Sequence, residues 1–269
     1  MDGRAGTATA IAAGSAHSCA INASTGNVIC WGRDAAGQAT PLAAVDGTAG
    51  TATAIAAGRY HSCAIQAGSG NVVCWGDDGA GQATPPPSVS GTTGTATAIS
   101  AGLDHSCAIQ TLTNEVICWG DDFYGQATPP PSVDGTAGTA TAISAGRFHS
   151  CAIQAGTGKV VCWGSDFSGQ ATPPAAVDGT AGTATAISDG GDHSCAIQTG
   201  TNKVLCWGDD FYGQAAPPAA VNGTVGTATA ISAGSFHTLA IAAPEPAAAF
   251  LSAASFASLL ALARRRRLG

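Results

Sequence analysis

Residues 50–93 read GTATAIAAGRYHSCAIQAGSGNVVCWGDDGAGQATPPPSVSGTT, and most of this string returns along the chain. Its opening hexapeptide, Gly-Thr-Ala-Thr-Ala-Ile, recurs every 44 residues without slippage, at Gly6, Gly50, Gly94, Gly138, Gly182 and Gly226. Five copies are complete, and a sixth, partial copy covers residues 226–243. A period of this length indicates a tandem-repeat protein in which each copy forms one structural unit.

One copy divides into four short strands separated by turn residues. Alternation over Thr51–Ile55 predicts a half-buried strand, and residues 61–65 and 72–76 form two more, joined by a Gly/Asn turn. Residues 82–84 are expected to form a short outer strand, ended by prolines that cannot donate to a ladder. Residues 1–243 are therefore predicted to form an all-β fold, a β-propeller with four-stranded blades. An open β-solenoid, whose coils are usually shorter, is the alternative.

The order of motifs within each copy resembles the regulator of chromosome condensation repeat family. The matching segments are Ala57-Gly58-x-x-His61-Ser62, Cys74-Trp75-Gly76 and Gly81-Gln82, with equivalents in every full copy. The short spacing and the run WGDDxxGQxTxP resemble bacterial exported members and the propeller-type protein that inhibits beta-lactamases. The resemblance implies a propeller. The nucleotide exchange activity of the founding member does not transfer through a shared fold.

Composition and motifs argue against two classes of function. The chain carries 10 Lys and Arg against 17 Asp and Glu, a formal net charge of -7, and phosphate backbones would repel such a surface. We therefore expect no nucleic-acid partner. The sequence contains no Gly-x-Ser-x-Gly, phosphate-loop or HExxH motif, and Glu115 is the only glutamate before residue 244. We expect no enzymatic activity, no metal and no cofactor.

The ten cysteines form five pairs, each eleven residues apart and flanking the predicted Gly/Asn turn. In a hairpin centred on that turn the two cysteines face each other on adjacent strands, within reach of a disulfide. The expected bridges are Cys19–Cys30, Cys63–Cys74, Cys107–Cys118, Cys151–Cys162 and Cys195–Cys206. Free thiols are one alternative. A metal site from residues such as His17, Cys19 and Cys30 is another, but it lacks a CxxC motif and a fourth ligand.

Two polar residue types recur at fixed repeat positions. The histidines are His17, His61, His105, His149, His193 and His237, and the aspartates are Asp34, Asp78, Asp122, Asp166 and Asp210. We expect each histidine to open the second strand and to bond to neighbouring backbone. We expect the aspartates to close turns through their own backbone, and a calcium role is the alternative.

Positions that vary between copies are the candidates for specific binding. They lie in the turn after the first strand and in the loop after Trp-Gly, and both loops should emerge on one face of the ring. Aromatic residues and Arg at such sites are typical of binding hot spots. We name these ten residues the aromatic rim: Arg59, Tyr60, Phe123, Tyr124, Arg147, Phe148, Phe167, Phe211, Tyr212 and Phe236. The alternative is that the rings pack over neighbouring blades.

The composition changes abruptly at residue 244. Pro244-Glu245-Pro246 precedes an uncharged apolar run over residues 247–263, which is expected to be a hydrophobic helix, and then Arg264, Arg265, Arg266 and Arg267. This ending resembles the PEP-CTERM sorting signal of Gram-negative bacteria. The resemblance implies processing by an exosortase and a place in the cell envelope or extracellular matrix. An ordinary membrane anchor is the alternative.

An exported protein needs an N-terminal signal, and residues 1–6 have no hydrophobic core. The chain also starts in phase with a repeat, and its last half-unit lacks a Cys-Trp-Gly strand. We expect the natural gene to continue upstream with a signal peptide and further blade sequence.

The predicted function is that of an exported, non-catalytic module at the cell envelope. Its rim would bind a surface protein or a polysaccharide. A structural envelope or matrix protein without a specific ligand is one alternative, and an inhibitor similar to the beta-lactamase inhibitory protein is the other.

Overall fold

A computed structural model describes residues 7–243, which form six successive antiparallel sheets. The first strands of the repeats are β1 (Ala8–Ala13), β4 (Ala52–Ala57), β7 (Ala96–Ala101), β10 (Ala140–Ala145), β13 (Ala184–Asp189) and β16 (Ala228–Ala233). The second strands are β2 (His17–Asn22), β5 (His61–Gln66), β8 (His105–Gln110), β11 (His149–Gln154), β14 (His193–Gln198) and β17 (Thr238–Ala242). The third strands are β3 (Val28–Gly32), β6 (Val72–Gly76), β9 (Val116–Gly120), β12 (Val160–Gly164) and β15 (Val204–Gly208).

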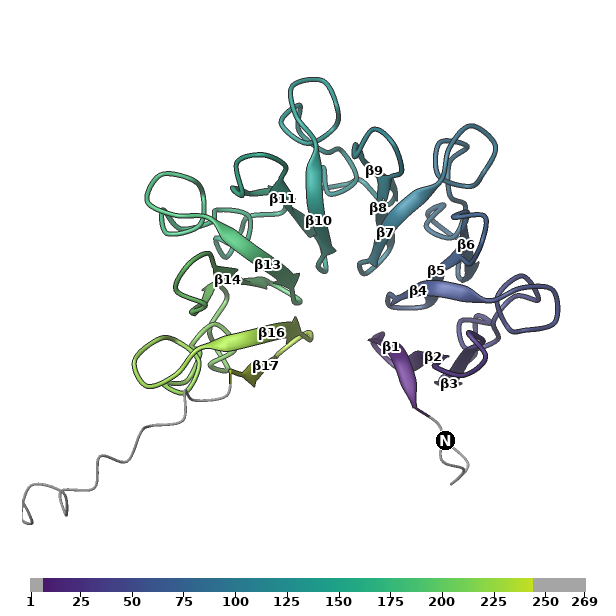
Figure 1. Cartoon of the computed structure of the whole chain (residues 1–269), viewed down its shortest axis with the longest axis horizontal. Coiled ribbons are helices and arrows are strands. Elements are labelled where there is room, and N and C mark those ends of the chain that lie inside the picture. Colours follow the sequence, from purple (N-terminus) through teal and green to yellow (C-terminus); the bar gives the residue numbers. More distant parts are fainter. Residues whose placement is uncertain (1–6, 244–269) are drawn as a thin grey trace, which may run out of the picture.

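The sheets stand side by side around a common centre, like the blades of a propeller (Figure 1). Each first strand contacts the first strand of the next repeat, and it also contacts the second strand of the repeat before it. The turns between first and second strands point toward the centre, and β1 and β16–β17 stand at the two ends of the arc. The all-β fold and the repeat of about 44 residues are confirmed.

The predicted hairpin register is also present. The second strand is the middle strand of each sheet, and in the second repeat Cys63 lies opposite Cys74. All five expected cysteine pairs are disulfides, with Cα–Cα distances of 4.0 to 4.1 Å. Because both cysteines belong to one hairpin, each disulfide cross-links two strands of a single repeat and does not join neighbouring repeats.

The predicted fourth strand is wrong, and each complete sheet has three strands. Residues 82–84 form a turn that the Asp78 carboxylate holds. Its two oxygens accept hydrogen bonds from the Ala83 amide, over 2.8 Å, and from the Thr84 hydroxyl, over 2.6 Å. These side-chain contacts satisfy the local polar groups in a turn, so they compete with a strand ladder. The same arrangement shows that the recurring aspartates close turns.

The hydrophobic core lies between neighbouring repeats. Ile21, Val28 and Val45 of the first repeat pack with Ala64 and Trp75 of the second, and the same grouping recurs along the arc. A single three-stranded sheet cannot bury both of its faces. Stability therefore comes from stacking each repeat on the next, as in other repeat proteins.

A buried polar ladder accompanies this core. In the first junction, His17 Nε2 contacts the Ser62 hydroxyl over 2.8 Å, and that hydroxyl donates to the Gln38 carbonyl over 3.0 Å. The Trp75 indole donates to the same carbonyl over 3.0 Å. His17, His61, His105, His149 and His193 have the expected structural role, but their partner is a hydroxyl of the next repeat and not neighbouring backbone. His237 differs, because it is exposed and β17 begins only at Thr238.

Among residues 7–243, no helix is long and apolar enough to cross a membrane. The expected C-terminal helix and the sorting residues 244–246 and 264–267 lie outside the described residues. Residues 1–6, used for the expectation about export, lie outside them as well.

Candidate functional site

Two loops of each repeat build the aromatic rim. Gly76 has a φ of 101° and turns the chain out of β6, where a Cβ would collide with the Tyr60 carbonyl oxygen. The Asp77 amide donates to that carbonyl over 2.8 Å, which ties the loop after the third strand to the first turn. The Gln82 side chain then spans the loop, because it accepts from the Ala80 amide and donates to Asp77 over 2.6 Å.

The rim residues gather into three groups on one face. Tyr124 contacts Phe123, Phe148 and Phe167, with ring centroids 4.8, 5.2 and 5.7 Å away. Tyr212 contacts Phe211 and Phe236 at 4.9 and 5.6 Å. Around Tyr60 the guanidinium groups of Arg59 and Arg33 lie 4.7 and 5.1 Å from the ring centroid. Contacts between the two kinds of loop show that both emerge on the same face, as expected.

Exposure separates the rim residues that pack from those that face water. Tyr124 is 38% exposed and is surrounded by the rings it contacts, whereas Phe123, Phe167 and Phe211 are 81, 86 and 82% exposed. Large apolar rings this open to water are uncommon unless another surface covers them. Tyr60 and Phe148 are half-buried and stack with arginines, so they support the rim more than they extend it.

The loops that carry the aromatic rim also hold many negative charges. Its first turns and its loops after the third strands hold three arginines, Arg33, Arg59 and Arg147. The same segments hold ten aspartates, Asp34, Asp77, Asp78, Asp104, Asp121, Asp122, Asp166, Asp192, Asp209 and Asp210. Two of the arginines face acidic partners, Arg59 with Asp104 at 3.7 Å and Arg147 with Asp192 at 3.6 Å.

The rim follows a period of two repeats, which the sequence contains and which our motif comparison missed. Arg59 and Arg147, Asp104 and Asp192, Phe123 and Phe211, and Tyr124 and Tyr212 are each 88 residues apart. Aromatic pairs therefore fill the junctions between repeats 3 and 4 and between repeats 5 and 6. Asp104 and Asp192 stand at the junctions between repeats 2 and 3 and between repeats 4 and 5.

Two hollows open beside these residues. One, of about 1290 Å³, occupies the centre and is lined by the first turns of all six repeats. The other, of about 540 Å³, lies at the junction of repeats 2 and 3, where Tyr60, Asp77, Asp104 and Asp121 are among its walls. Burial raises the pKa of Asp104, Arg59 lowers it in part, and the charges of Asp77 and Asp121 raise it further.

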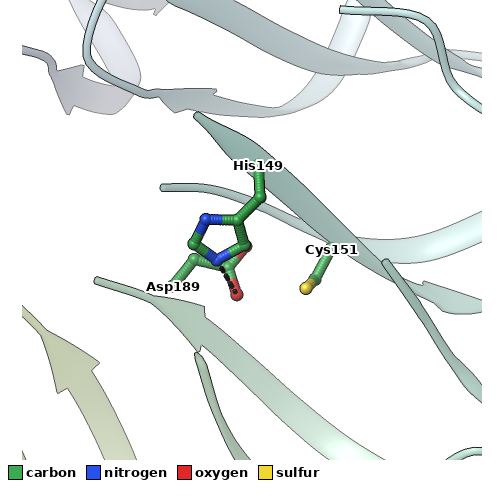
Figure 2. A group of neighbouring side chains, drawn as sticks. All are labelled: His149, Cys151 and Asp189. Carbon is green, nitrogen blue, oxygen red and sulfur yellow. Dashed lines mark ion pairs between the residues drawn. The ribbon is translucent and has the colours of Figure 1, made fainter. Parts of the chain in front are cut away.

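One buried residue breaks the symmetry of the repeats. Asp189, at the end of β13, occupies a position that is alanine in the other five copies, and neither of its carboxylate oxygens has a hydrogen-bond partner within residues 7–243. Figure 2 shows its carboxylate facing the His149 ring, with Oδ1 3.8 Å from Nε2. Burial raises the pKa of Asp189 to about 7 and lowers the pKa of His149 to about 3. The change from ISAG to ISDG was a visible signal that the sequence reasoning overlooked.

This group does not have the geometry of a catalytic triad or of a complete metal site. The Ser194 hydroxyl lies 2.9 Å from His149 Nε2, the same nitrogen that faces Asp189, whereas a triad uses the two ring nitrogens separately. The Cys151 sulfur lies within 4.8 Å of the possible ligand atoms of His149 and Asp189, but it is bonded to the sulfur of Cys162. A disulfide sulfur is not the thiolate that a metal requires.

A family model for the regulator of chromosome condensation (RCC1) repeat matches residues 8–38, 52–82, 96–126, 140–170 and 184–214, more than half of the chain. The chain belongs to the RCC1 repeat family. Each match runs from the first strand to the glutamine of the rim loop, so it contains the histidine, both cysteines and the tryptophan. No curated protein matches the chain.

Solved structures share the fold of this RCC1-repeat chain. The CRINKLY WD40 ectodomain of the Arabidopsis thaliana receptor kinase ACR4 is 23% identical, with a TM-score of 0.69 over 89% of this chain and 77% of that one. Yeast RCC1 (Prp20), from its structure with Kap60, is 17% identical, with a TM-score of 0.65 over 87% of this chain and 67% of that one. Prp20p of Saccharomyces cerevisiae, in a second structure, is 18% identical, with a TM-score of 0.64 over 89% of this chain and 70% of that one. At these identities the likeness shows the propeller-like fold alone.

Proposed function

We propose that this RCC1-repeat chain is a non-catalytic module that binds a protein partner through the aromatic rim. The observation that carries the proposal is the gathering of Phe123, Phe167 and Phe211 on one loop face, each more than four-fifths exposed. Covering a phenylalanine side chain contributes about 2 kcal/mol, and aromatic side chains dominate the energetics of protein interfaces.

Proteins of the same fold support this class of function. One solved structure contains Kap60 bound to yeast RCC1 (Prp20), and another is described with the binding of Prp20p to Gsp1p and histones. The surroundings of Asp189, the buried carboxyl that breaks the repeat symmetry, also favour a non-catalytic role. The Ser194 and His149 side chains are fully buried, so a substrate could not reach them in this conformation.

We further propose that the chain is exported and works at the cell envelope of a Gram-negative bacterium. Five disulfides favour an oxidising compartment. The Pro-Glu-Pro, apolar and arginine segments of residues 244–269 would serve as a sorting signal that holds the chain in the membrane until an exosortase-type enzyme processes it. Detection of the tail-free chain outside the cytoplasm, by mass spectrometry of cell fractions, tests this part.

Capture with matched variants of the full oxidised chain tests the binding function. The rim variant is Phe123→Ala with Phe167→Ala and Phe211→Ala, and the control variant is Leu112→Ala with Val225→Ala. Leu112 and Val225 are 96 and 70% exposed but lie in turns at the opposite ends of the strands. Wild type and control should capture the same protein from cells that produce the chain, and the purified pair should bind directly. Equal capture by the rim variant would refute the proposal.

A further inference from the structure

We propose that the partner presents an extended polypeptide segment rich in lysine and arginine, which lies along the aromatic rim. This inference rests on the proposed function, because it names the chemistry of the segment that the rim would bind. Three features of the rim carry it: an excess of carboxylates, a hollow between two repeats, and the two-repeat period.

The charge of the rim is uneven in a way that favours a cationic partner. Ten aspartates face three arginines there, and Arg59 and Arg147 are already paired with acidic neighbours. Both lysines of the described residues, Lys159 and Lys203, lie in the turns between second and third strands, at the far ends of the strands from the rim. The negative potential therefore accumulates on the same face as the exposed rings, and it would attract a positively charged segment.

The hollow at the junction of repeats 2 and 3 suits a cationic side chain. Asp77, Asp104, Asp121 and Tyr60 line it. Arg59 lines it as well and pairs with Asp104, which leaves the carboxylates of Asp77 and Asp121 for a ligand. Asp77 and Asp121 each accept a glutamine amide through Oδ2, over 2.6 Å, which holds both carboxylates in place beside the hollow. An ammonium or guanidinium group placed there would meet the carboxylates of Asp77 and Asp121 beside the Tyr60 ring.

The two-repeat period indicates an extended ligand. The Arg–Asp pair and the Phe–Tyr pair each recur after 88 residues, so these two pairs occur twice along the arc, although Ser165 replaces Asp77 in the second copy. A polypeptide with several basic residues can use both copies at once, which raises its affinity without new kinds of contact. Aliphatic stems of lysine and arginine can cover the exposed rings while their charged ends reach the aspartates.

Ring geometry favours a polypeptide over a cationic polysaccharide. Neighbouring rings meet edge to face, at interplanar angles of 85° for Phe123 with Tyr124, 90° for Tyr124 with Phe167 and 88° for Phe211 with Tyr212. These rings therefore face in different directions and do not form one coplanar platform for a run of sugar rings. Flexible side chains can contact the exposed rings separately.

The probes are fluorescein-labelled peptides of one length in which lysine and arginine are replaced by glutamine or by glutamate, together with a partly deacetylated chitin oligomer. Anisotropy with the full oxidised chain should show the basic peptide binding about tenfold or more tightly than the glutamine peptide. Its affinity should fall as salt rises from about 50 to about 300 mM. Equal affinity of basic and glutamine peptides, or tighter binding of the chitin oligomer, would overturn the proposal.

Matched charge variants locate the site. Asp77→Asn with Asp121→Asn and Asp209→Asn removes three rim charges but keeps an acceptor oxygen for each glutamine amide. Asp46→Asn with Asp134→Asn and Asp178→Asn removes three charges at the other ends of the strands, where each carboxylate also accepts one hydrogen bond. We expect the rim variant to weaken the basic peptide about tenfold and the control less than about twofold. Equal weakening would mean a diffuse charge effect and would refute the rim as the site.

The two proposals fail in different ways. If a captured partner is lost with the phenylalanine variant but binds the rim charge variant with unchanged affinity, the rim binds a protein and the basic segment is wrong. If the phenylalanine variant keeps the partner, the proposed function itself is wrong. Circular dichroism of every variant at the same temperature shows whether a loss of binding reflects a loss of folding.

Discussion

The His61 imidazole and the Ser106 hydroxyl, 45 residues apart in the chain, are joined by a buried contact of 2.9 Å between Nε2 and Oγ. The single hydroxyl proton of Ser106 goes to the Gln82 carbonyl, so Nε2 must carry the proton that it donates to Ser106. Nδ1 is then a buried acceptor to which no group in the described part of the chain donates. Protonating it would create a buried charged N–H without an acceptor among the described residues, which explains why His61 is neutral at ordinary pH.

Acid should therefore destabilise the fold. Burial lowers the pKa of His61 to about 4, and that of His105 and His149 to about 3, from an ordinary value of 6.5. A lowered histidine pKa means that the unfolded chain binds more protons, so this stability is complete above pH 6.5 and is lost as pH falls toward 4. The three histidines together should lower the free energy of unfolding by about 4 kcal/mol per pH unit between pH 6 and 5. Guanidinium unfolding of the Asp189→Asn variant, which lacks the opposing titration of that carboxyl, measures this by tryptophan fluorescence.

His105→Gln is the control for that slope. A glutamine amide can still donate to the Ser150 hydroxyl but does not titrate, so the slope should fall by about one proton, or 1.4 kcal/mol per pH unit. Unfolding that is flat between pH 7 and 5 in the Asp189→Asn variant would contradict the neutral histidine ladder.

Asp189 should act in the opposite direction. Its pKa is raised from 3.8 to about 7 by burial, so the folded chain binds more protons than the unfolded chain between these values. Its contribution is most favourable below pH 4 and is lost as pH rises through 7, by up to about 4 kcal/mol. Asp189→Ala, which restores the residue of the other repeats, should raise the free energy of unfolding at pH 8 more than at pH 4. Asp189→Asn, neutral throughout, should show the same pH-dependent gain over wild type.

The tryptophans offer a comparison between two equivalent positions. Trp119 is buried and its indole donates to the Gln82 carbonyl over 2.9 Å, whereas Trp31 is 43% exposed. Trp119→Phe should cost about 2 to 4 kcal/mol, through lost packing and one lost hydrogen bond. Trp31→Phe should cost less than about 1 kcal/mol. Similar losses at both sites, measured by urea unfolding, would show that the junction is not the source of the stability.

Each disulfide should stabilise its own repeat. Closing the hairpin between Cys107 and Cys118 restricts the unfolded chain, and replacing both cysteines with alanine should cost about 3 kcal/mol. Calorimetry of the double variant beside the wild type measures the difference. Alkylation of the wild-type chain without reductant, followed by intact mass, should add no label. Labelling of several cysteines would contradict the five bridges.

Much of the scaffold could be predicted from single repeats. The strands around residues 52–57, 61–66 and 72–76 follow from alternation and turn residues, and Cys63 faces Cys74 because a hairpin fixes the register of its two strands. The outer strand at residues 82–84 could not be predicted correctly. The Asp78 side chain accepts hydrogen bonds from this segment, and the strand propensity of the individual residues gives no information about that contact.

For the candidate site, too, the sequence predicted which residues take part but not how they pack. Comparing copies of the repeat identified the rim residues, and it could also have revealed their two-repeat period and Asp189. It could not show that Tyr124 is partly covered, at 38% exposed, while Phe123 beside it is 81% exposed. That difference arises from Phe148 and Phe167 of the next repeat, which approach Tyr124 only after the sheets have stacked.

The sequence by itself determined the repeat, its strands, its turns and its disulfide pairs, because each of these depends on residues within about twelve positions of one another. Only the tertiary structure decided the lowered pKa of His61, His105 and His149, the raised pKa of Asp189 and the exposure of each ring. The physical reason is that burial and hydrogen-bond partners come from the adjacent repeat, about 44 residues away, and no local pattern records which side chains that repeat brings into contact.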